Sequence, residues 1–255
     1  MKRSISNKKI YYLLGIVLFV VFWQVLAMII DQQKMIFPGP YASLQYALKL
    51  LTREYTYRCI KATFLKALCG YAISFAIALL LGVIAGNFEV FEQLMKPTVT
   101  VLRAIPTASL IYLFIALAGF RNAPVLLVIV ISFPIIYEGV VAGIRNISKS
   151  IKGALLVDGA DLLRSNIRVR LPLAVPYIIV AMANSFSLSF KIEIMAEVIT
   201  GASSAGLGSA LLGARANDPS NMVPIFAYSL ISLFLILLID FICSFIANKL
   251  TDNVL

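Results

Sequence analysis

Three ionisable residues, Lys191, Glu193 and Glu197, lie in an apolar stretch over residues 173–198. A charged side chain at the centre of a bilayer costs at least about 2.5–3.5 kcal/mol on insertion scales, so such residues face protein or water. Glu193 and Glu197 are four residues apart and share one face of a helix. We expect this face to line a water-filled pathway or a subunit interface. The alternative is that Glu197 is solvated near the membrane surface.

Residues that commonly carry catalysis or bind metals are scarce. The chain has no histidine, which excludes Ser-His-Asp triads and His-based acid–base catalysis. Its cysteines, Cys59, Cys69 and Cys243, show no CxxC spacing and are expected to be small apolar residues rather than disulfides or metal ligands. Asp158 and Asp161 resemble part of a membrane phosphatidyl transferase signature, but the further aspartates that would hold metals are missing. We therefore predict that the chain is not an enzyme.

The chain also lacks the GxxxxGK[ST] motif that binds nucleotide phosphates. We therefore expect no resident cofactor, and any ATP and Mg²⁺ to be bound by another protein.

The composition is that of a membrane protein. Of the 255 residues, 61% are hydrophobic and 13% are charged, and the mean hydropathy is +0.94. A soluble domain has about a quarter charged residues and under half apolar residues. The net charge of +10 could indicate a nucleic-acid partner, but the basic residues lie between hydrophobic blocks and form no stripe with interleaved aromatics. We therefore expect cytoplasmic basic loops, membrane lipid as a partner and no nucleic acid.

Six segments are long and apolar enough to cross a bilayer, which takes about 20 residues. They are residues 10–30, 60–86, 97–118, 124–144, 173–198 and 223–247. The third begins at Pro97 and contains Arg103 and Pro106; Arg103 is interpreted as reaching the membrane surface at a helix start rather than as a gate. The N-terminal run is longer than a signal-peptide core and has no small-residue cleavage site, so we expect a retained span.

The distribution of Lys and Arg predicts the orientation. With the N-terminus inside, the cytoplasmic segments hold 12 basic residues and the outside segments hold 6, which places both termini in the cytoplasm. In the outside segment 31–58, a turn over residues 37–40 precedes apolar residues at helical spacing, typical of a short interfacial helix. Residues 199–221 are rich in Gly, Ser and Ala and predict a re-entrant or surface helix. We expect one membrane domain, with residues 1–58 as its N-terminal span and outside helix and residues 59–255 as its core.

The longest cytoplasmic connection, residues 145–172, has the pattern of two short helices. Apolar residues from Ile151 to Leu156 can form one face, and Gly159 permits a turn. A second apolar face precedes Leu171-Pro172, where that helix is expected to stop. A short amphipathic helix pair outside the membrane is suited to bind in a groove on another protein.

Parts of this loop resemble the EAA loop of binding-protein-dependent ABC importer permeases, whose pattern is Glu-Ala-Ala, three residues, Gly, about eleven residues and Leu-Pro. Here Gly153 stands for the family's Glu and Leu155 for its third-position Ala. The resemblance implies that eight residues couple the chain to an ATPase: Gly153, Ala154, Leu155, Gly159, Ala160, Leu163, Leu171 and Pro172. With the Glu absent, docking is expected to depend on shape and apolar contact.

Other blocks extend the resemblance from about residue 37 onward. Residues 37–40 resemble the family's Pro-Ser-Pro turn, and residues 102–106 resemble its Leu-Arg-x-Ile-Pro element. Ala196-Glu197, residues 206–208 and Asp240 fall where the nitrate, sulfonate and taurine subfamily has similar residues. In this order, and with six spans, the blocks identify the chain as a member of the family.

This resemblance implies an all-α membrane fold of the type I importer class, with six transmembrane helices and a coupling helix pair between spans 4 and 5. Two permease subunits, here a homodimer, would form the pathway in a bacterial inner membrane. Two cytoplasmic ATPase subunits would each receive one loop, and an extracytoplasmic binding protein would deliver the solute. The implied solutes are nitrate, sulfonates, taurine or thiamine precursors.

Two other transporter classes are alternatives. An ion-gradient-driven secondary carrier or channel would have broken helices in paired halves, but no repeat relates residues 10–118 to residues 124–247. The membrane component of a vitamin-type energy-coupling transporter would carry Ala-Arg-Gly triplets, which this chain lacks.

Overall fold

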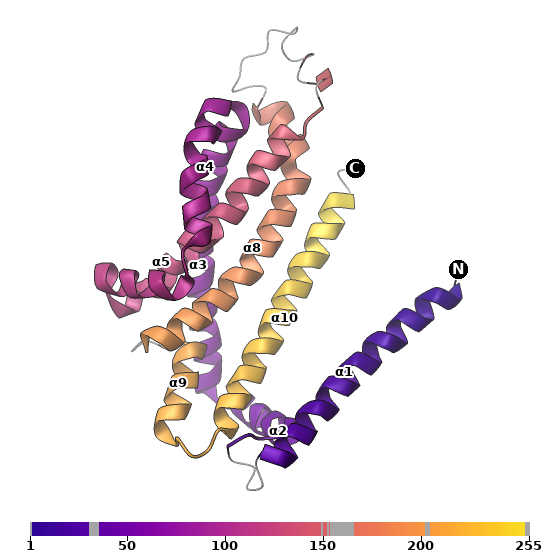
Figure 1. The fold of residues 1–255 in the computed structure, drawn as a ribbon, viewed down its shortest axis with the longest axis vertical. Helices are drawn as coiled ribbons and strands as arrows, with labels where there is room; N and C mark the ends of the chain where they lie inside the picture. The colour runs from indigo at the N-terminus through magenta and orange to yellow at the C-terminus, as the bar shows by residue number, and fades with distance from the viewer. Residues whose placement is uncertain are drawn as a thin grey trace.

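The computed structural model describes residues 2–30, 36–148, 150–151, 153, 166–201 and 205–252, and these contain helices and turns but no strand. The predicted all-α fold is therefore confirmed (Figure 1). Its helices are α1 (Lys2–Ile30), α2 (Pro40–Leu51), α3 (Glu54–Asn87), α4 (Glu89–Ala104), α5 (Thr107–Arg145), the π-helical turn η1 (Asn166–Arg170), α8 (Leu171–Thr200), α9 (Leu207–Asn217) and α10 (Val223–Asp252).

Five of these helices are long and apolar enough to cross a membrane. They are Ile10–Ile30, Glu54–Asn87, Thr107–Arg145, Arg168–Thr200 and Val223–Thr251. Each contains one of the predicted spans, because a membrane helix satisfies all its backbone hydrogen bonds internally and so must be one long apolar run. The remaining predicted span, residues 97–118, differs.

The prediction that residues 97–118 form one helix is wrong. Pro97 lies inside α4 rather than at a helix start, and the chain leaves the helical conformation at Ile105 and Pro106, where ψ is 128°. A residue before proline is driven out of the helical region by its contact with the proline ring. A second break occurs at Gly119, whose φ of 76° glycine adopts without strain. The chain therefore turns twice here, and the first part of α5 departs from the line of α4 (Figure 1).

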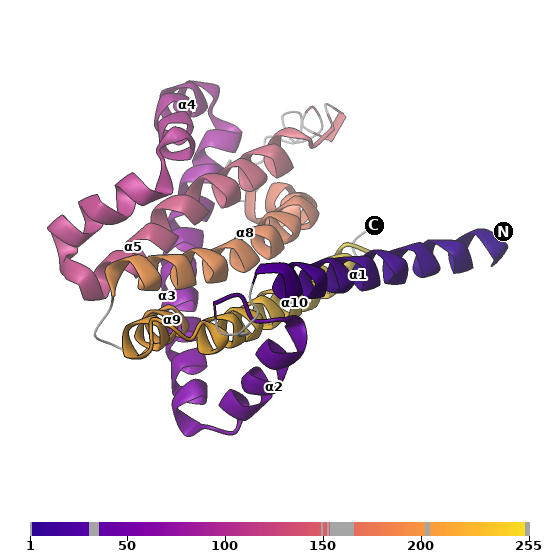
Figure 2. The same cartoon turned by 60° about the horizontal axis from the view of Figure 1, so that its bottom comes forward.

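Helices α3, α5 and α8 form the centre of the bundle, with α5 and α8 side by side (Figure 2). Glycines bring their backbones close together. A Cβ at Gly139 of α5 would lie 2.2 Å from the Cβ of Ala181, and a Cβ at Gly82 of α3 would lie 2.8 Å from the Cβ of Val140. The hydrophobic effect does not drive helices together inside a lipid bilayer. Contacts between membrane helices are therefore stabilised by close packing through small residues.

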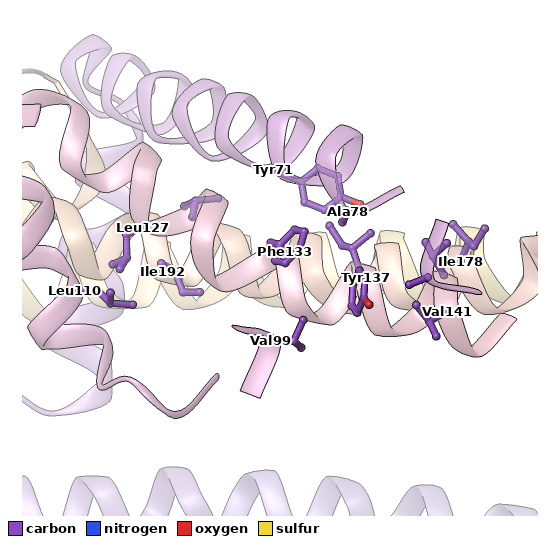
Figure 3. Close-up of a cluster of buried hydrophobic side chains, with 14 of the residues drawn as sticks. Tyr71, Ala78, Val99, Leu110, Leu127, Phe133, Tyr137, Val141, Ile178 and Ile192 are labelled. Atoms are coloured by element: carbon purple, nitrogen blue, oxygen red, sulfur yellow. The ribbon is translucent and has the colours of Figure 1, made fainter. Parts of the chain in front are cut away.

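The buried side chains of this centre form an apolar cluster along α5. Figure 3 shows Leu127, Phe133 and Tyr137 of α5 in a row, with Ile192 of α8 and Val99 of α4 beside them. Because α4 and α8 pack against this row, the cluster fixes the positions of both helices relative to α5.

Helices α2 and α9 lie at the other end of the molecule from the end of α5 and the start of α8 (Figure 1). The predicted short helix after residues 37–40 is confirmed as α2, which begins at Pro40 and whose Ser43 hydroxyl donates to the Gly39 carbonyl at 3.0 Å. The predicted short helix within 199–221 is α9, which with 11 residues is too short to span. A second buried cluster joins these helices to α3, α8 and α10; its buried members include Leu50, Cys59, Phe190, Leu207 and Tyr228.

Helix α1 diverges from the bundle, and its N-terminal end points away from the other helices in both Figure 1 and Figure 2. Residues 10–22 are all exposed. Near the other end, the Trp23 ring lies 6.1 Å from the ring of Phe226 on α10. So apolar an exposed surface is suited to lipid or to another subunit. The predicted division at residue 58 stays a prediction.

Candidate transport site

Helix α8 carries two polar stripes on opposite sides. One consists of Ser185, Ser189, Glu193 and Glu197, four residues apart in turn and all 0% exposed. The other consists of Asn184 and Lys191, which are exposed, and the half-buried Ser187. At 100° per residue the centres of the two stripes are about half a turn apart. The three predicted residues therefore do not share one surface, since Lys191 faces away from Glu193 and Glu197.

Glu197 is the centre of a hydrogen-bonded group that joins α3, α8 and α9. Lys66 Nζ donates to Glu197 Oε1 at 2.9 Å, and Thr63 Oγ1 donates to Glu197 Oε2 at 2.8 Å. The backbone N–H of Gly208 donates to the same Oε2 at 3.0 Å. We call Thr63, Lys66, Glu197 and residues 205–208 the Glu197 cluster. Because Glu197 is completely buried, the alternative that it is solvated at the membrane surface is wrong.

The chain that enters α9 is held by the same cluster. The Leu207 N–H donates to Thr63 Oγ1 at 2.8 Å, and Lys66 Nζ also donates to the Ala205 carbonyl at 3.3 Å. There is no room here for side chains: a Cβ at Gly206 would lie 2.2 Å from Glu197 Oε1, and one at Gly208 would lie 2.4 Å from the Ile194 carbonyl. The two glycines therefore allow the backbone to reach the carboxylate.

Sequence reasoning missed the partner of Glu197. Lys66 lies in the predicted second span, residues 60–86, and the rule that gives an intramembrane glutamate a partner applies equally to an intramembrane lysine. Thr63 precedes Lys66 by one helical turn and so shares its face. Thr63 and Lys66 were therefore the residues in the sequence that could have indicated a polar partner for Glu197.

Glu193 is buried one turn before Glu197 but is not part of the hydrogen-bonded group. Neither of its carboxylate oxygens has a hydrogen-bond partner among the described residues. One turn earlier, Ser189 Oγ lies 2.7 Å from Ser132 Oγ of α5 and donates to the Ser185 carbonyl at 2.6 Å. The buried stripe thus joins α8 to α5 through hydroxyl groups and to α3 through charge.

Two ion pairs join α4 to the second half of α5. Glu92 pairs with Arg145 at one end. At the other end, Arg103 Nη1 lies 2.6 Å and 2.8 Å from the two carboxylate oxygens of Glu138. Arg103 therefore binds a carboxylate of the same chain, and its side chain and that of Glu138 remain 59% and 47% exposed.

Between these ion pairs lies a groove of about 350 Å³, here called the α4–α5 groove. Lys96 and Thr100 of α4 line one side of it, and Tyr137 of α5 lines the other. The Tyr137 hydroxyl is buried and has no hydrogen-bond partner among the described residues. The remaining lining residues are Glu92, Val99, Glu138, Val141, Ala142 and Arg145. The groove therefore offers an ammonium group and hydroxyl groups to a small polar molecule.

Only part of the predicted coupling loop is described. Its first turn follows Ser148, whose Oγ accepts the Ile151 N–H at 3.4 Å as a helix-capping side chain does. Gly153 is helical and half-buried, and a Cβ there would meet no atom of the described residues within 4 Å. Leu171 and Pro172 begin α8 rather than ending a loop helix. The other predicted coupling residues, Ala154, Leu155, Gly159, Ala160 and Leu163, lie outside the described residues.

The loop returns to the bundle at Arg170, whose guanidinium donates to the Asn87 side-chain carbonyl at the end of α3. Asn87 in turn donates to the Val83 carbonyl at 2.7 Å. The second end of the loop is thereby fixed to α3. Among the described residues, no group of three His, Cys, Asp or Glu side chains could hold a metal ion.

Comparison with known proteins supports a transport role. The chain is 28% identical over 174 residues to a probable ABC transporter permease protein of Brucella melitensis, covering 68% of this chain and 70% of that one. It is 29% identical over 197 residues to the nitrate import permease protein NrtB of Leptolyngbya laminosa, covering 76% and 68% of the two chains. A putative aliphatic sulfonates transport permease protein SsuC of Bacillus subtilis is 23% identical over 227 residues, covering 87% and 81%.

Solved structures share the fold. A chain of the MetNI methionine ABC transporter in an inward-facing conformation superposes with a TM-score of 0.65 at 20% identity, covering 76% of this chain and 94% of that one. A chain of an amino acid ABC transporter superposes with a TM-score of 0.65 at 16% identity, covering 80% and 97%. Residues 78–252 match the family described as binding-protein-dependent transport system inner membrane component. The chain therefore belongs to this family of ABC importer permeases.

Proposed function

We propose that two copies of this chain form a pathway for a small solute across a bacterial inner membrane, with both termini in the cytoplasm. The observation that supports it best is the polar surface on α4, α5 and α8. Arg103, Glu138 and Lys191 are all exposed on helices of a membrane protein. Exposed charges of this kind must face water or another subunit, because lipid would not solvate them.

Helix α10, which lies beyond α8 from α4 and α5 in Figure 1, supports this assignment. On α10, Asp240 is exposed and would, like the charges above, face water or another subunit. The other exposed residues around it include the large apolar Leu237, Phe241 and Phe245. Such a surface is suited to lipid. The polar surface would then face the second subunit across a water-filled space, with Lys191 lining it and with Glu193 and Glu197 supporting its wall from inside the subunit.

The solute that we propose is a small anion such as nitrate or a sulfonate. In the α4–α5 groove and the adjoining ion pair, Arg145 and Arg103 are matched by Glu92 and Glu138. Lys96 makes no ion pair with a described residue, which leaves the groove one positive charge in excess. The related NrtB and SsuC are named for nitrate and for aliphatic sulfonates. A thiamine-precursor heterocycle is the alternative solute.

ATP hydrolysis would take place in a partner ATPase, which also binds the ATP and Mg²⁺. We propose that the ATPase receives the loop through Gly153, Ala154, Leu155, Gly159, Ala160, Leu163, Leu171 and Pro172. Gly153 gives the ATPase no carboxylate, and no described atom lies within 4 Å of the place a Cβ would take there. Contact at this end of the loop would therefore depend on backbone shape and apolar side chains. Movement of the loop would reach α3 through Arg170 and Asn87.

Co-purification with the ABC ATPase tests this function. Leu163→Glu and Gly159→Asp are expected to release the ATPase and to abolish uptake into proteoliposomes that contain the ATPase and the binding protein. Ser150→Glu is the control. Ser150 is exposed in the same loop, and the substitution adds one negative charge, as Leu163→Glu and Gly159→Asp do. Uptake by the purified chain in the absence of any ATPase would contradict the proposal and favour an ion-gradient-driven carrier.

A further inference from the structure

A second cavity lies at the end of the molecule that holds α2 and α9. Its volume is about 420 Å³, and it opens where α2, α3, α9 and α10 meet. We call it the outer cavity; it is lined by Tyr46, Leu50, Arg53, Tyr55, Ala210, Gly213, Ala214, Asn217, Asp218, Asn221, Pro224 and Tyr228. Cavities of this size that combine aromatic walls with a few convergent polar groups are typical of binding sites.

Two charged side chains line the outer cavity, Arg53 and Asp218, and they make no ion pair with each other. Asp218 accepts the Ser220 hydroxyl at 2.7 Å, and the Asn221 side-chain oxygen accepts the Val223 N–H at 3.0 Å. Arg53 makes neither an ion pair nor a hydrogen bond with a side chain among the described residues. An exposed guanidinium beside tyrosine hydroxyls is suited to a carboxylate, which it can bind with two parallel hydrogen bonds.

None of the residues that line the outer cavity lies on α4, α5 or α8. Leu50 and Tyr228 are buried at its inner end and belong to the apolar cluster that also contains Phe190 and Ile194 of α8. A carboxylate in this cavity would therefore be part of a molecule that binds from outside, rather than a solute in transit.

The segment 49–61, which contributes Leu50, Arg53 and Tyr55 to the cavity lining, is basic. Residues 49–61 include Lys49, Arg53, Arg58 and Lys61 but only one acidic residue, Glu54. Glu54 pairs with Arg58 at 3.7 Å, which leaves three positive charges in excess in this segment, against the single negative charge of Asp218 in the cavity lining. Such a surface complements an acidic one and attracts it before contact.

We infer that the outer cavity receives an Asp or Glu side chain from the surface of the extracytoplasmic solute-binding protein, whose carboxylate binds Arg53. This inference rests on the proposed function, which places α2 and α9 outside. Docking there would act directly on α9, whose first residues are hydrogen-bonded to Thr63 and Glu197. The bound protein would thus contact the helix that is tied to α3 and α8.

The test uses the complete transporter in lipid nanodiscs and measures ATPase activity against the concentration of solute-loaded binding protein. Arg53→Glu is expected to raise the concentration for half-maximal stimulation about tenfold or more, because a like-charge contact replaces an attractive one. The maximal rate and the unstimulated rate are expected to stay unchanged. Arg121→Glu is the matched control, because Arg121 is exposed on α5, outside the cavity and its basic segment; it is expected to shift the concentration less than about twofold.

A charge exchange identifies the partner residue. Replacing the contacting Asp or Glu of the binding protein with Arg is expected to restore stimulation of Arg53→Glu and to weaken stimulation of the unmodified transporter. An unchanged half-maximal concentration in Arg53→Glu would overturn the inference, as would loss of direct binding of the free solute in that variant. Loss of the ATPase from the complex would instead contradict the proposed function, so the two failures are distinguishable.

Discussion

The two ends of this bundle are held together by different interactions. Near the loop, α5 packs on α3 and α8 through Gly82, Gly139 and Ala181, with backbones in close contact. Toward α9, the helices are joined by the buried Lys66–Glu197 ion pair and its hydrogen bonds. Close packing tolerates no added atom, whereas a buried ion pair tolerates no lost charge. Substitutions that add side-chain atoms should therefore be most harmful near the loop, and substitutions that remove a charge should be most harmful toward α9.

The largest effect is expected at the ion pair. Lys66→Met should destabilise the chain by about 3–5 kcal/mol, because it leaves the Glu197 charge buried without its counter-ion. Thermal unfolding of the purified protein in detergent measures this loss. Lys61→Met on the same helix is the control, since Lys61 is exposed and should change the melting temperature little.

The double variant with Lys66→Met and Glu197→Gln separates charge from packing. It should be more stable than Lys66→Met alone, because no uncompensated charge remains while the amide oxygen can still accept from Thr63. A double variant that is less stable than Lys66→Met would show that the pair does not act through charge.

The second effect is expected at the other end. Gly139→Val should destabilise the protein by about 1–3 kcal/mol, because its Cβ would lie 2.2 Å from that of Ala181 and would force α5 and α8 apart. Gly15→Val is the matched control, since a Cβ at Gly15 of α1 would meet no atom within 4 Å. Equal melting temperatures for the two variants would refute the close contact. Gly139→Val combined with Ala181→Gly should recover part of the loss.

The sequence predicts where the long helices lie, but it does not predict where they break or which residues pair between them. Hydropathy places the spans that contain α1, α3, α8 and α10, because each is one apolar run. It does not predict the breaks at Ile105 and Gly119, which depend on φ and ψ at single residues. The charges of Lys66 and Glu197 each indicate a buried partner, but one sequence cannot pair residues 131 positions apart.

A smaller effect is expected for the hydroxyl contact between α5 and α8. Ser189→Ala removes the contact between Ser189 and Ser132 and should cost about 0.6 kcal/mol, the average for side-chain hydrogen bonds between membrane helices. The measurement is the same unfolding experiment, with Ser187→Ala as the half-buried control on the other stripe. A loss as large as that of Lys66→Met would remove the distinction between hydroxyl and charge contacts on α8.

The smallest effect is expected for the other ion pair of α3. Glu54 and Arg58 lie one turn apart at 3.7 Å, with side chains 85% and 66% exposed, so water already solvates both charges. Glu54→Gln should therefore cost about 0.3–0.5 kcal/mol, roughly a tenth of the loss in Lys66→Met. The pair should also weaken with added salt, because water and ions screen exposed charges, whereas the Lys66–Glu197 pair should not. Unfolding at low and high salt measures both differences within one helix. An equal salt dependence of the two variants would mean that water reaches Glu197, and the polar end of the bundle would then be a solvated region rather than a buried one.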